Sequence, residues 1–167
     1  MRCIIIYFDV NFNKILLVIT IFGVIGIGGL YIYADSEVTI AINSVADSLE
    51  YMDSRLEDFS LFPTSATYVY VYRLENPSNI DVTFTYYAEI YFEEQYVSTL
   101  EFEILVPAKR SVTVETEEHI GKEAFEMLQG LSEIEYHYIG SFTGEGKFLI
   151  FTIKKTWSNE WDWLATQ

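Results

Sequence analysis

The amino-acid sequence predicts a mostly β protein, an antiparallel β-sandwich domain that follows one N-terminal membrane-spanning helix. Two stretches carry this prediction. Residues 82–92 (VTFTYYAEIYF) alternate between two sets of side chains, and a period of two over this length places one face of a strand inward and the other outward. Residues 15–33 contain no charged side chain, and at about 1.5 Å of rise per residue they nearly match a hydrocarbon core of about 30 Å.

Three more strands are predicted around residues 82–92, at residues 67–75, 99–106 and 111–115. The polar residues 93–95 interrupt the alternation as a hairpin turn would, and the NPSN sequence at 76–79 is a strong turn signal. Pro107 ends the strand before it, because proline lacks the N–H that a strand ladder needs. Four successive strands with short connections predict an antiparallel meander or a Greek key.

The segments before this group are predicted to be one strand and one helix. Residues 38–42 (VTIAI) have the β-branched content of a first strand that leaves the membrane. In residues 44–58 the apolar side chains recur every three or four residues, which predicts an amphipathic helix that packs against the sheet. The polar face of that helix is acidic, so it is not the basic face that binds membrane surfaces.

The segments after residue 120 are predicted to close the domain. Residues 122–131 (KEAFEMLQGL) predict a short second helix with its apolar side chains toward the core. Residues 134–143 and 147–155 predict a hairpin whose turn is the GEG sequence at 144–146. The last segment, 156–167, carries all three tryptophans, and we expect it either to anchor at a bilayer interface or to cap the open end of the sandwich.

The composition excludes some partners. The formal net charge is −15, with 10 Lys and Arg against 25 Asp and Glu. Nucleic-acid binding rests on basic side chains that neutralise phosphates, so we expect no nucleic-acid partner. The aromatic fraction of 17% supplies ample apolar surface to bury, which argues against disorder. Cys3 is the single cysteine, so no intrachain disulfide is possible.

The charges on either side of the apolar segment predict the topology. Arg2 and Lys14 precede it, whereas Asp35 and Glu37 follow it, and the flank richer in basic residues stays in the cytoplasm. A cleavable signal peptide is the main alternative, but the residue three positions before the cleavage point, Ile32, is too large. We therefore expect an uncleaved signal anchor and an extracytoplasmic domain, with these parts: 1–14 as the cytoplasmic N-terminus, 15–33 as the transmembrane helix, 34–155 as the β-sandwich and 156–167 as a Trp-rich tail.

The order of elements resembles that of the group 2 late embryogenesis abundant (LEA) family, which includes the water-stress and hypersensitive-response (WHy) domain. The resemblance covers residues 38–155 and rests on a strand that ends in Asn76-Pro77, the break at Val106-Pro107-Ala108 and Tyr138-Ile139-Gly140 in a late strand. It implies a seven-stranded immunoglobulin-like or fibronectin-like sandwich with one helix and a non-enzymatic, stress-linked role. Several members are membrane-tethered, and an apolar, lipid-handling groove has been suggested for some relatives.

No residue is predicted to be catalytic, to bind a cofactor or to ligate a metal. Residues 140–147 (GSFTGEGK) differ from a phosphate-binding loop, because five residues separate the outer glycines and Phe148 stands where Ser or Thr is required. His119 and His137 lack an HExxH pattern or a cysteine partner for zinc. Two acidic clusters lack EF-hand spacing and are interpreted as solvated charges: Glu93 and Glu94 in a turn, and Glu115, Glu117 and Glu118 at a strand end.

Three functions remain open. The first is a tethered, non-catalytic domain outside the cell that protects against stress or binds a partner. The second is a lipid or apolar-ligand binder, which predicts a cavity between the sheets. The third is a structural subunit of a surface assembly, which predicts stable oligomers. The tyrosine row Tyr68, Tyr70 and Tyr72 bears on the second, since it forms either an aromatic ligand platform or part of the core.

Overall fold

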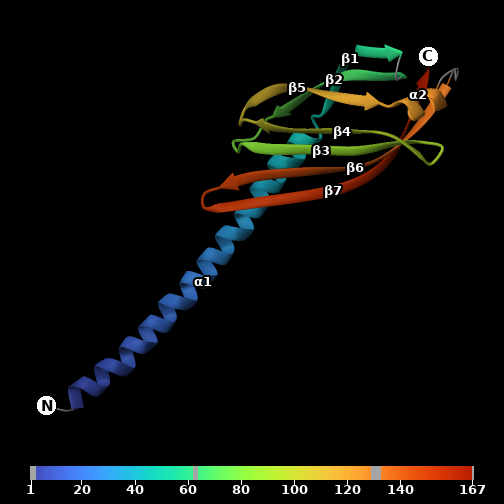
Figure 1. The fold of residues 1–167 in the computed structure, drawn as a ribbon. Coiled ribbons are helices and arrows are strands. Elements are labelled where there is room, and N and C mark those ends of the chain that lie inside the picture. Colours follow the sequence, from blue (N-terminus) through green and yellow to red (C-terminus); the bar gives the residue numbers. More distant parts are fainter. Residues whose placement is uncertain (1–2, 62–63, 129–132, 167) are drawn as a thin grey trace.

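The computed structural model describes residues 3–61, 64–128 and 133–166. They form a long helix that leads into a β-sandwich (Figure 1). The elements, in chain order, are α1 (Cys3–Ala46), β1 (Glu50–Leu61), β2 (Thr64–Asn76), β3 (Val82–Phe92), β4 (Gln95–Val106), β5 (Arg110–Ile120), α2 (Lys122–Leu128), β6 (Glu133–Phe148) and β7 (Phe151–Thr166).

The strands make two antiparallel sheets, one of three strands in the order β1-β2-β5 and one of four in the order β4-β3-β6-β7. Three hairpins, β1–β2, β3–β4 and β6–β7, stay within a sheet. The chain crosses between sheets after β2, after β4 and, by way of α2, after β5. These crossings make the arrangement a Greek key and not a meander. The predicted seven-stranded, immunoglobulin-like or fibronectin-like sandwich is confirmed.

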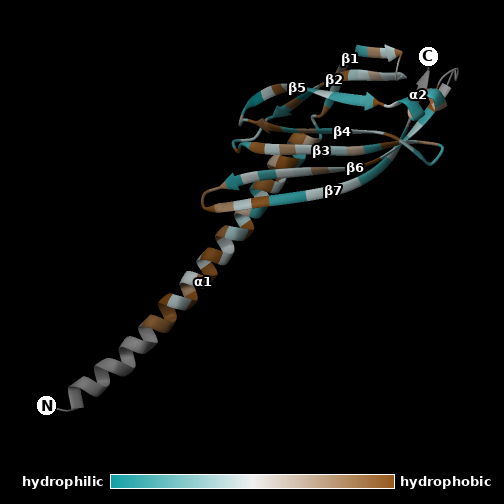
Figure 2. Cartoon of the chain, in the orientation of Figure 1, coloured by the Kyte–Doolittle hydropathy of each residue, from teal (hydrophilic) through white to brown (hydrophobic). Residues whose placement is uncertain are grey.

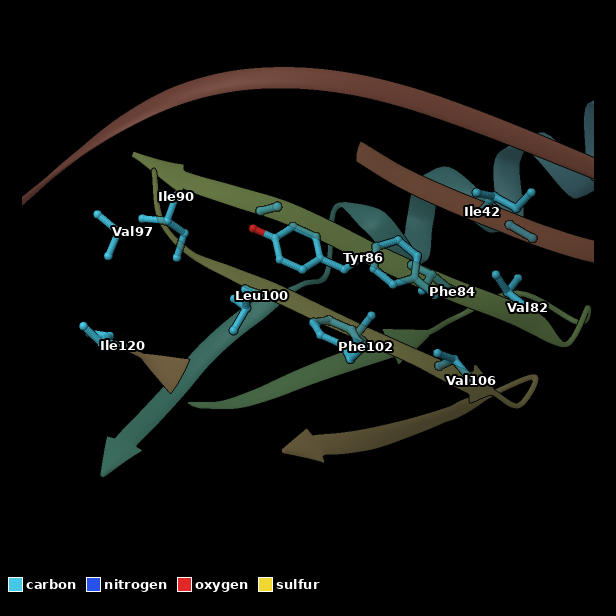
Figure 3. Close-up of a cluster of buried hydrophobic side chains, with 14 of the residues drawn as sticks. Ile42, Val82, Phe84, Tyr86, Ile90, Val97, Leu100, Phe102, Val106 and Ile120 are labelled. Carbon is cyan, nitrogen blue, oxygen red and sulfur yellow. The ribbon is translucent and has the colours of Figure 1, made fainter. Parts of the chain in front are cut away.

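The strand prediction at 82–92 is confirmed residue for residue, and its apolar face is the core. The alternating residues of β3 from Val82 to Phe92 are buried, and they meet the buried face of β4. Figure 3 shows Phe84, Tyr86, Leu100 and Phe102 together at the centre of this cluster. Because one face of each strand packs on the core and the other does not, apolar residues recur at every second position of the sequence.

The prediction of a strand at 38–42 is wrong, because α1 continues to Ala46. Its final turns pack against β6, β7, β2 and β3. The side chains at helical spacing there are completely buried: Val38, Ala41, Ile42 and Val45. Residues with a preference for strands are thus held in a helix by the core contacts that they make, since packing outweighs a modest propensity.

The prediction of a helix at 44–58 is wrong, because residues 50–58 belong to β1, which pairs with β2. The register shifts twice, between Tyr51 and Asp53 and between Leu56 and Asp58. Each such bulge adds a residue to one strand. The side chains on the inner face of β1 are therefore spaced by two or three residues, and in the sequence this spacing resembles helical periodicity.

The C-terminal prediction needs two corrections. The β6–β7 turn lies at Leu149 and Ile150, not at 144–146. Gly144 and Gly146 instead lie within β6, where a Cβ would collide with Ile42 and Val38 of α1. Residues 156–166 are not a separate tail, since they extend β7 along β6. The predicted helix at 122–131 is α2, which begins at Lys122, while residues 129–131 lie outside the described residues.

Candidate ligand cavity

The two long edges of the sandwich differ. At one edge β5 is bonded to β4, since the Thr116 hydroxyl donates to the Glu101 carbonyl over 2.8 Å. At the other edge β1 lies opposite β6 and β7 with its side chains exposed. Tyr51 and Leu56 are each 53% exposed, although their cross-strand partners on β2 face the other sheet. This edge is therefore open.

A cavity of about 440 Å³ lies behind the open edge, between the two sheets. This volume is within the range of about 300–1,000 Å³ that is usual for small-molecule sites. Most of the lining side chains are aromatic, and they come from both sheets: Leu49, Tyr51, Tyr70, Tyr72, Tyr86, Ile90, Leu100, Tyr138, Phe142, Trp161 and Asp162. The cavity therefore offers flat apolar walls, and five of its lining residues are tyrosines that carry a hydroxyl group.

One wall of the cavity is a stack of parallel rings on β6 and β7. The Trp161 ring lies 5.4 Å from that of Tyr138 at an angle of 8°, and 6.3 Å from that of Phe142 at 14°. Gly140 lies between these two β6 residues, and a Cβ there would come within 2.8 Å of the Trp161 ring. The glycine therefore leaves the space that lets the indole lie flat against the strand.

A buried carboxylate lies behind the opposite wall. Glu118 of β5 is 4% exposed, and each of its oxygens accepts one hydrogen bond. The Tyr70 hydroxyl donates to Oε2 over 2.6 Å, and the Ser98 hydroxyl donates to Oε1. These bonds compensate the cost of removing a carboxylate from water. The interpretation of Glu118 as a solvated edge charge is thus wrong.

Four tyrosines of the cavity, namely Tyr70, Tyr72, Tyr86 and Tyr138, have a raised pKa. Burial, followed by the negative Glu118, raises the pKa of Tyr72 to about 12 and shifts the pKa of Tyr70 and Tyr138 upward as well. Burial also raises the pKa of Tyr86. Within the described part of the chain, the hydroxyls of Tyr72, Tyr86 and Tyr138 make no hydrogen bond. They are available to a polar group of a ligand.

The residues considered for metal or phosphate chemistry are dispersed. His119 lies 3.3 Å from the Thr67 hydroxyl, and His137 pairs with Asp162 over 2.7 Å in an exposed position. Residues 140–147 are part of β6 and not a loop. The described residues contain no group of three His, Cys, Asp or Glu side chains that could hold a metal ion.

The acidic residues near strand ends have separate environments. Glu115 forms an exposed ion pair with Arg55 at 2.8 Å, and the hydrogen bond and charge of Arg55 lower the pKa of Glu115. Glu93 and Glu94 occupy the β3–β4 turn with positive φ of 48° and 68°. Only Glu118 contacts a cavity residue, through Tyr70. The interpretation as solvent-exposed charges holds for the other four of these five glutamates, Glu93, Glu94, Glu115 and Glu117.

Two of the eleven lining residues belong to the tyrosine row that the sequence predicts. Tyr70 and Tyr72 were recognised as a row that either binds a ligand or packs in the core, and they do face the cavity. Trp161 was assigned to a tail and Tyr51 to a helix, so neither was expected here. The signal that points to both is pairing: Trp161 lies opposite Tyr138, and Tyr51 opposite Tyr72.

No family model matches the chain, and a search of curated proteins found no match. Among solved structures, a protein from Archaeoglobus fulgidus is similar over 72% of this chain and 99% of its own, with 9% identity and a TM-score of 0.46. A protein from Arabidopsis thaliana is similar over 69% and 80%, with 14% identity and a TM-score of 0.35. A candidate LEA protein is similar over 86% and 88%, with 10% identity and a TM-score of 0.33. This level of similarity does not assign the chain to a family.

Proposed function

We propose that this chain is a single-pass, membrane-anchored and non-catalytic domain that binds an apolar ligand between its two sheets. The aromatic cavity at the open edge is the observation that carries this proposal. A cavity that is largely apolar, with a few polar groups at fixed positions, is the usual form of a small-molecule site. Of the three functions that the sequence leaves open, the second is the one that requires such a cavity.

The anchor is the first part of α1. This helix is long and apolar enough to cross a membrane, and all residues from Leu16 to Tyr33 are exposed. Figure 2 shows the apolar part of α1 extending away from the sandwich. In this first part of α1, apolar side chains are exposed around the full circumference of the helix, and such a surface is stable in lipid and not in water. With Lys14 before the span and Asp35 after it, we propose that the domain is extracytoplasmic.

The charges near the cavity narrow the ligand class. Glu118 lies behind Tyr70, and Asp162 lies at the lining itself. Glu118 is buried, so solvent screens its charge only weakly, and it would repel an anionic group placed beside Tyr70. We therefore propose a ligand with an apolar body, such as an acyl chain or a ring system, and a neutral or cationic polar group that meets the tyrosine hydroxyls.

The resemblance to the LEA family supports the non-enzymatic part of the proposal and a stress-linked role. Under this proposal the domain takes an apolar molecule from the membrane, or delivers one to it. The other functions, a protein-binding module and a subunit of an assembly, become outcomes of the test described next.

The test uses the full chain in lipid nanodiscs and the neutral apolar fluorophore N-phenyl-1-naphthylamine. Leu49→Trp places a bulky ring at the lining of the cavity, and Leu105→Trp places the same ring on an exposed outer position of β4. We expect Leu49→Trp to weaken binding by about tenfold and Leu105→Trp to leave it unchanged, since only the first fills the cavity. Equal binding by both variants, with stable oligomers, would favour the assembly function instead.

A further inference from the structure

The turn between β6 and β7 contains residue types that are unfavourable for its backbone conformation. Leu149 and Ile150 form this two-residue turn, and Leu149 has a φ of 55°. Two-residue hairpin turns prefer Asn-Gly or Asp-Gly, because residues with side chains are strained at positive φ. Leu149 is 63% exposed and Ile150 is 82% exposed, so neither is held there by the core. Strain and exposed apolar surface at one point indicate a functional contact.

The position of this turn identifies the contact. The Phe151 ring lies 5.5 Å from that of Tyr31, and the Phe148 ring lies 5.7 Å from that of Tyr33. Tyr31 is only four residues before Asp35, the first charge after the apolar segment, which is about 6 Å along the helix. The turn therefore lies at the level where α1 leaves the apolar stretch, and tyrosines favour that level of a bilayer. Figure 2 shows the apolar turn beside the helix.

The charge around the turn differs from that of the rest of the chain. The net charge of the whole chain is −15, but Lys147, Lys154 and Lys155 flank the apolar turn. Lys155 pairs with Asp35 over 2.7 Å, which compensates a carboxylate at the end of the span. Lysines beside an apolar tip can extend to lipid head groups while the tip enters the acyl region.

We propose that residues 148–151 insert into the outer leaflet of the bilayer that α1 spans. The domain is then attached at two points, by the helix and by the β6–β7 tip, and it keeps a fixed tilt relative to the membrane. The occupant of this surface is the lipid bilayer, because the tip contacts the same end of the helix that meets lipid. This inference rests on the proposed membrane span and its orientation, but it concerns a surface other than the cavity and holds whether or not the cavity binds a ligand.

The experiment places an environment-sensitive NBD label in the full chain, with Cys3→Ser as the background. The label is introduced at Ile150→Cys and, as a matched control, at Glu94→Cys in the exposed β3–β4 turn. The register places the control at the opposite end of the sandwich, because Val82 pairs with Gly146 near one turn and Tyr91 with His137 near the other. The proteins are reconstituted in vesicles of phosphatidylcholine and phosphatidylglycerol, with or without doxyl-labelled phosphatidylcholine.

We expect doxyl lipid to lower the emission at position 150 by about twofold or more and to leave position 94 unchanged, since only the tip enters the leaflet. No quenching at 150, or equal quenching at both positions, would overturn the proposal. A label at 150 that is shielded from water but not quenched would show that a second copy of the chain covers the tip, which also overturns it.

A second variant separates insertion from folding. Leu149→Asn with Ile150→Gly gives the turn its favoured sequence, so the hairpin should keep or gain stability. With the label at the neighbouring exposed Thr152→Cys, we expect quenching in the original turn and its loss in the Asn-Gly turn, at an unchanged unfolding midpoint. Quenching that persists in the Asn-Gly protein would overturn the proposal.

Discussion

The two long edges of the sandwich differ in the side chains that they carry and in how far they are closed. At the β4–β5 edge, hydroxyl groups bond across the sheets, from Thr116 to Glu101 and from Ser98 to Glu118. At the β1–β7 edge, aromatic side chains line a cavity and remain partly exposed. One sealed edge, together with the final turns of α1 in the core, holds the sheets together. We therefore expect stability not to depend on closing the second edge, which would leave that edge free to bind.

The largest expected effect comes from the sealed part of the core. Phe84 is completely buried, and its ring lies 6.3 Å from that of Phe102 and 6.1 Å from that of Phe142. We expect Phe84→Ala to lower the free energy of unfolding by about 3–5 kcal/mol, since it removes apolar contacts and leaves a void. Chemical denaturation of the full chain in detergent measures the loss. A change of less than about 1 kcal/mol would mean that the core can rearrange, and it would contradict the comparison.

The next effect tests how α1 closes the end of the sandwich. A Cβ on Gly144 would collide with Ile42, whereas one on Gly121 would meet nothing within 4 Å. We expect Gly144→Ala to cost about 1–3 kcal/mol, because the helix must shift away from β6, and Gly121→Ala to cost much less. If Gly144→Ala costs much less in an Ile42→Ala background than in the original chain, both measured by thermal unfolding, the strain lies between these two side chains. Equal midpoints for both glycine variants would be evidence against this packing.

Two glutamates of β5 differ in their environment, because one is buried at the sealed edge and the other is exposed to solvent. Glu118 is buried and accepts two hydrogen bonds, while Glu115 is exposed beside Arg55. We expect Glu118→Gln to destabilise by about 1–3 kcal/mol, because the amide NH₂ cannot accept a bond and leaves one hydroxyl unpaired. Glu115→Gln makes the same chemical change at the surface, and we expect no measurable shift of its unfolding midpoint. Similar shifts in the two variants would show that Glu118 is not a buried acceptor.

Some of the elements behind these effects can be predicted from the sequence, and others cannot. β3 and β4 were predictable because each buries one face, so that the period of two is intact. β1 was not, because bulges at Tyr51/Asp53 and Leu56/Asp58 change its period. The glycines at 144 and 146 gave a turn signal, but they are contacts with a helix that lies about a hundred residues earlier in the chain.

The candidate site likewise has residues that the sequence predicts and residues that it does not. The row of Tyr70 and Tyr72 is visible in the sequence, because it belongs to one strand. The cavity as a whole is not visible, since Tyr51 and Trp161 reach it only through pairing with other strands. Glu118 was assigned to the surface because a carboxylate usually lies there. Its burial depends on Tyr70 and Ser98, which are 48 and 20 residues away.

Tyr51 at the open edge is the residue whose removal should affect stability least while it clearly weakens ligand binding. It therefore tests most directly whether the open edge differs from the sealed one. Tyr51 lies 6.0 Å from Tyr72 and 6.4 Å from Tyr70, measured between ring centroids, yet it is half exposed. We expect Tyr51→Ala to change the free energy of unfolding by less than about 1 kcal/mol, as truncations of exposed side chains do. It removes one aromatic wall of the cavity, and we expect binding of N-phenyl-1-naphthylamine to weaken by about tenfold, equivalent to about 1.4 kcal/mol. The neighbouring Met52→Ala, exposed to a similar degree but outside the cavity lining, should affect neither quantity. If Tyr51→Ala instead unfolded the domain, the open edge would be a structural element, and binding would have to lie elsewhere.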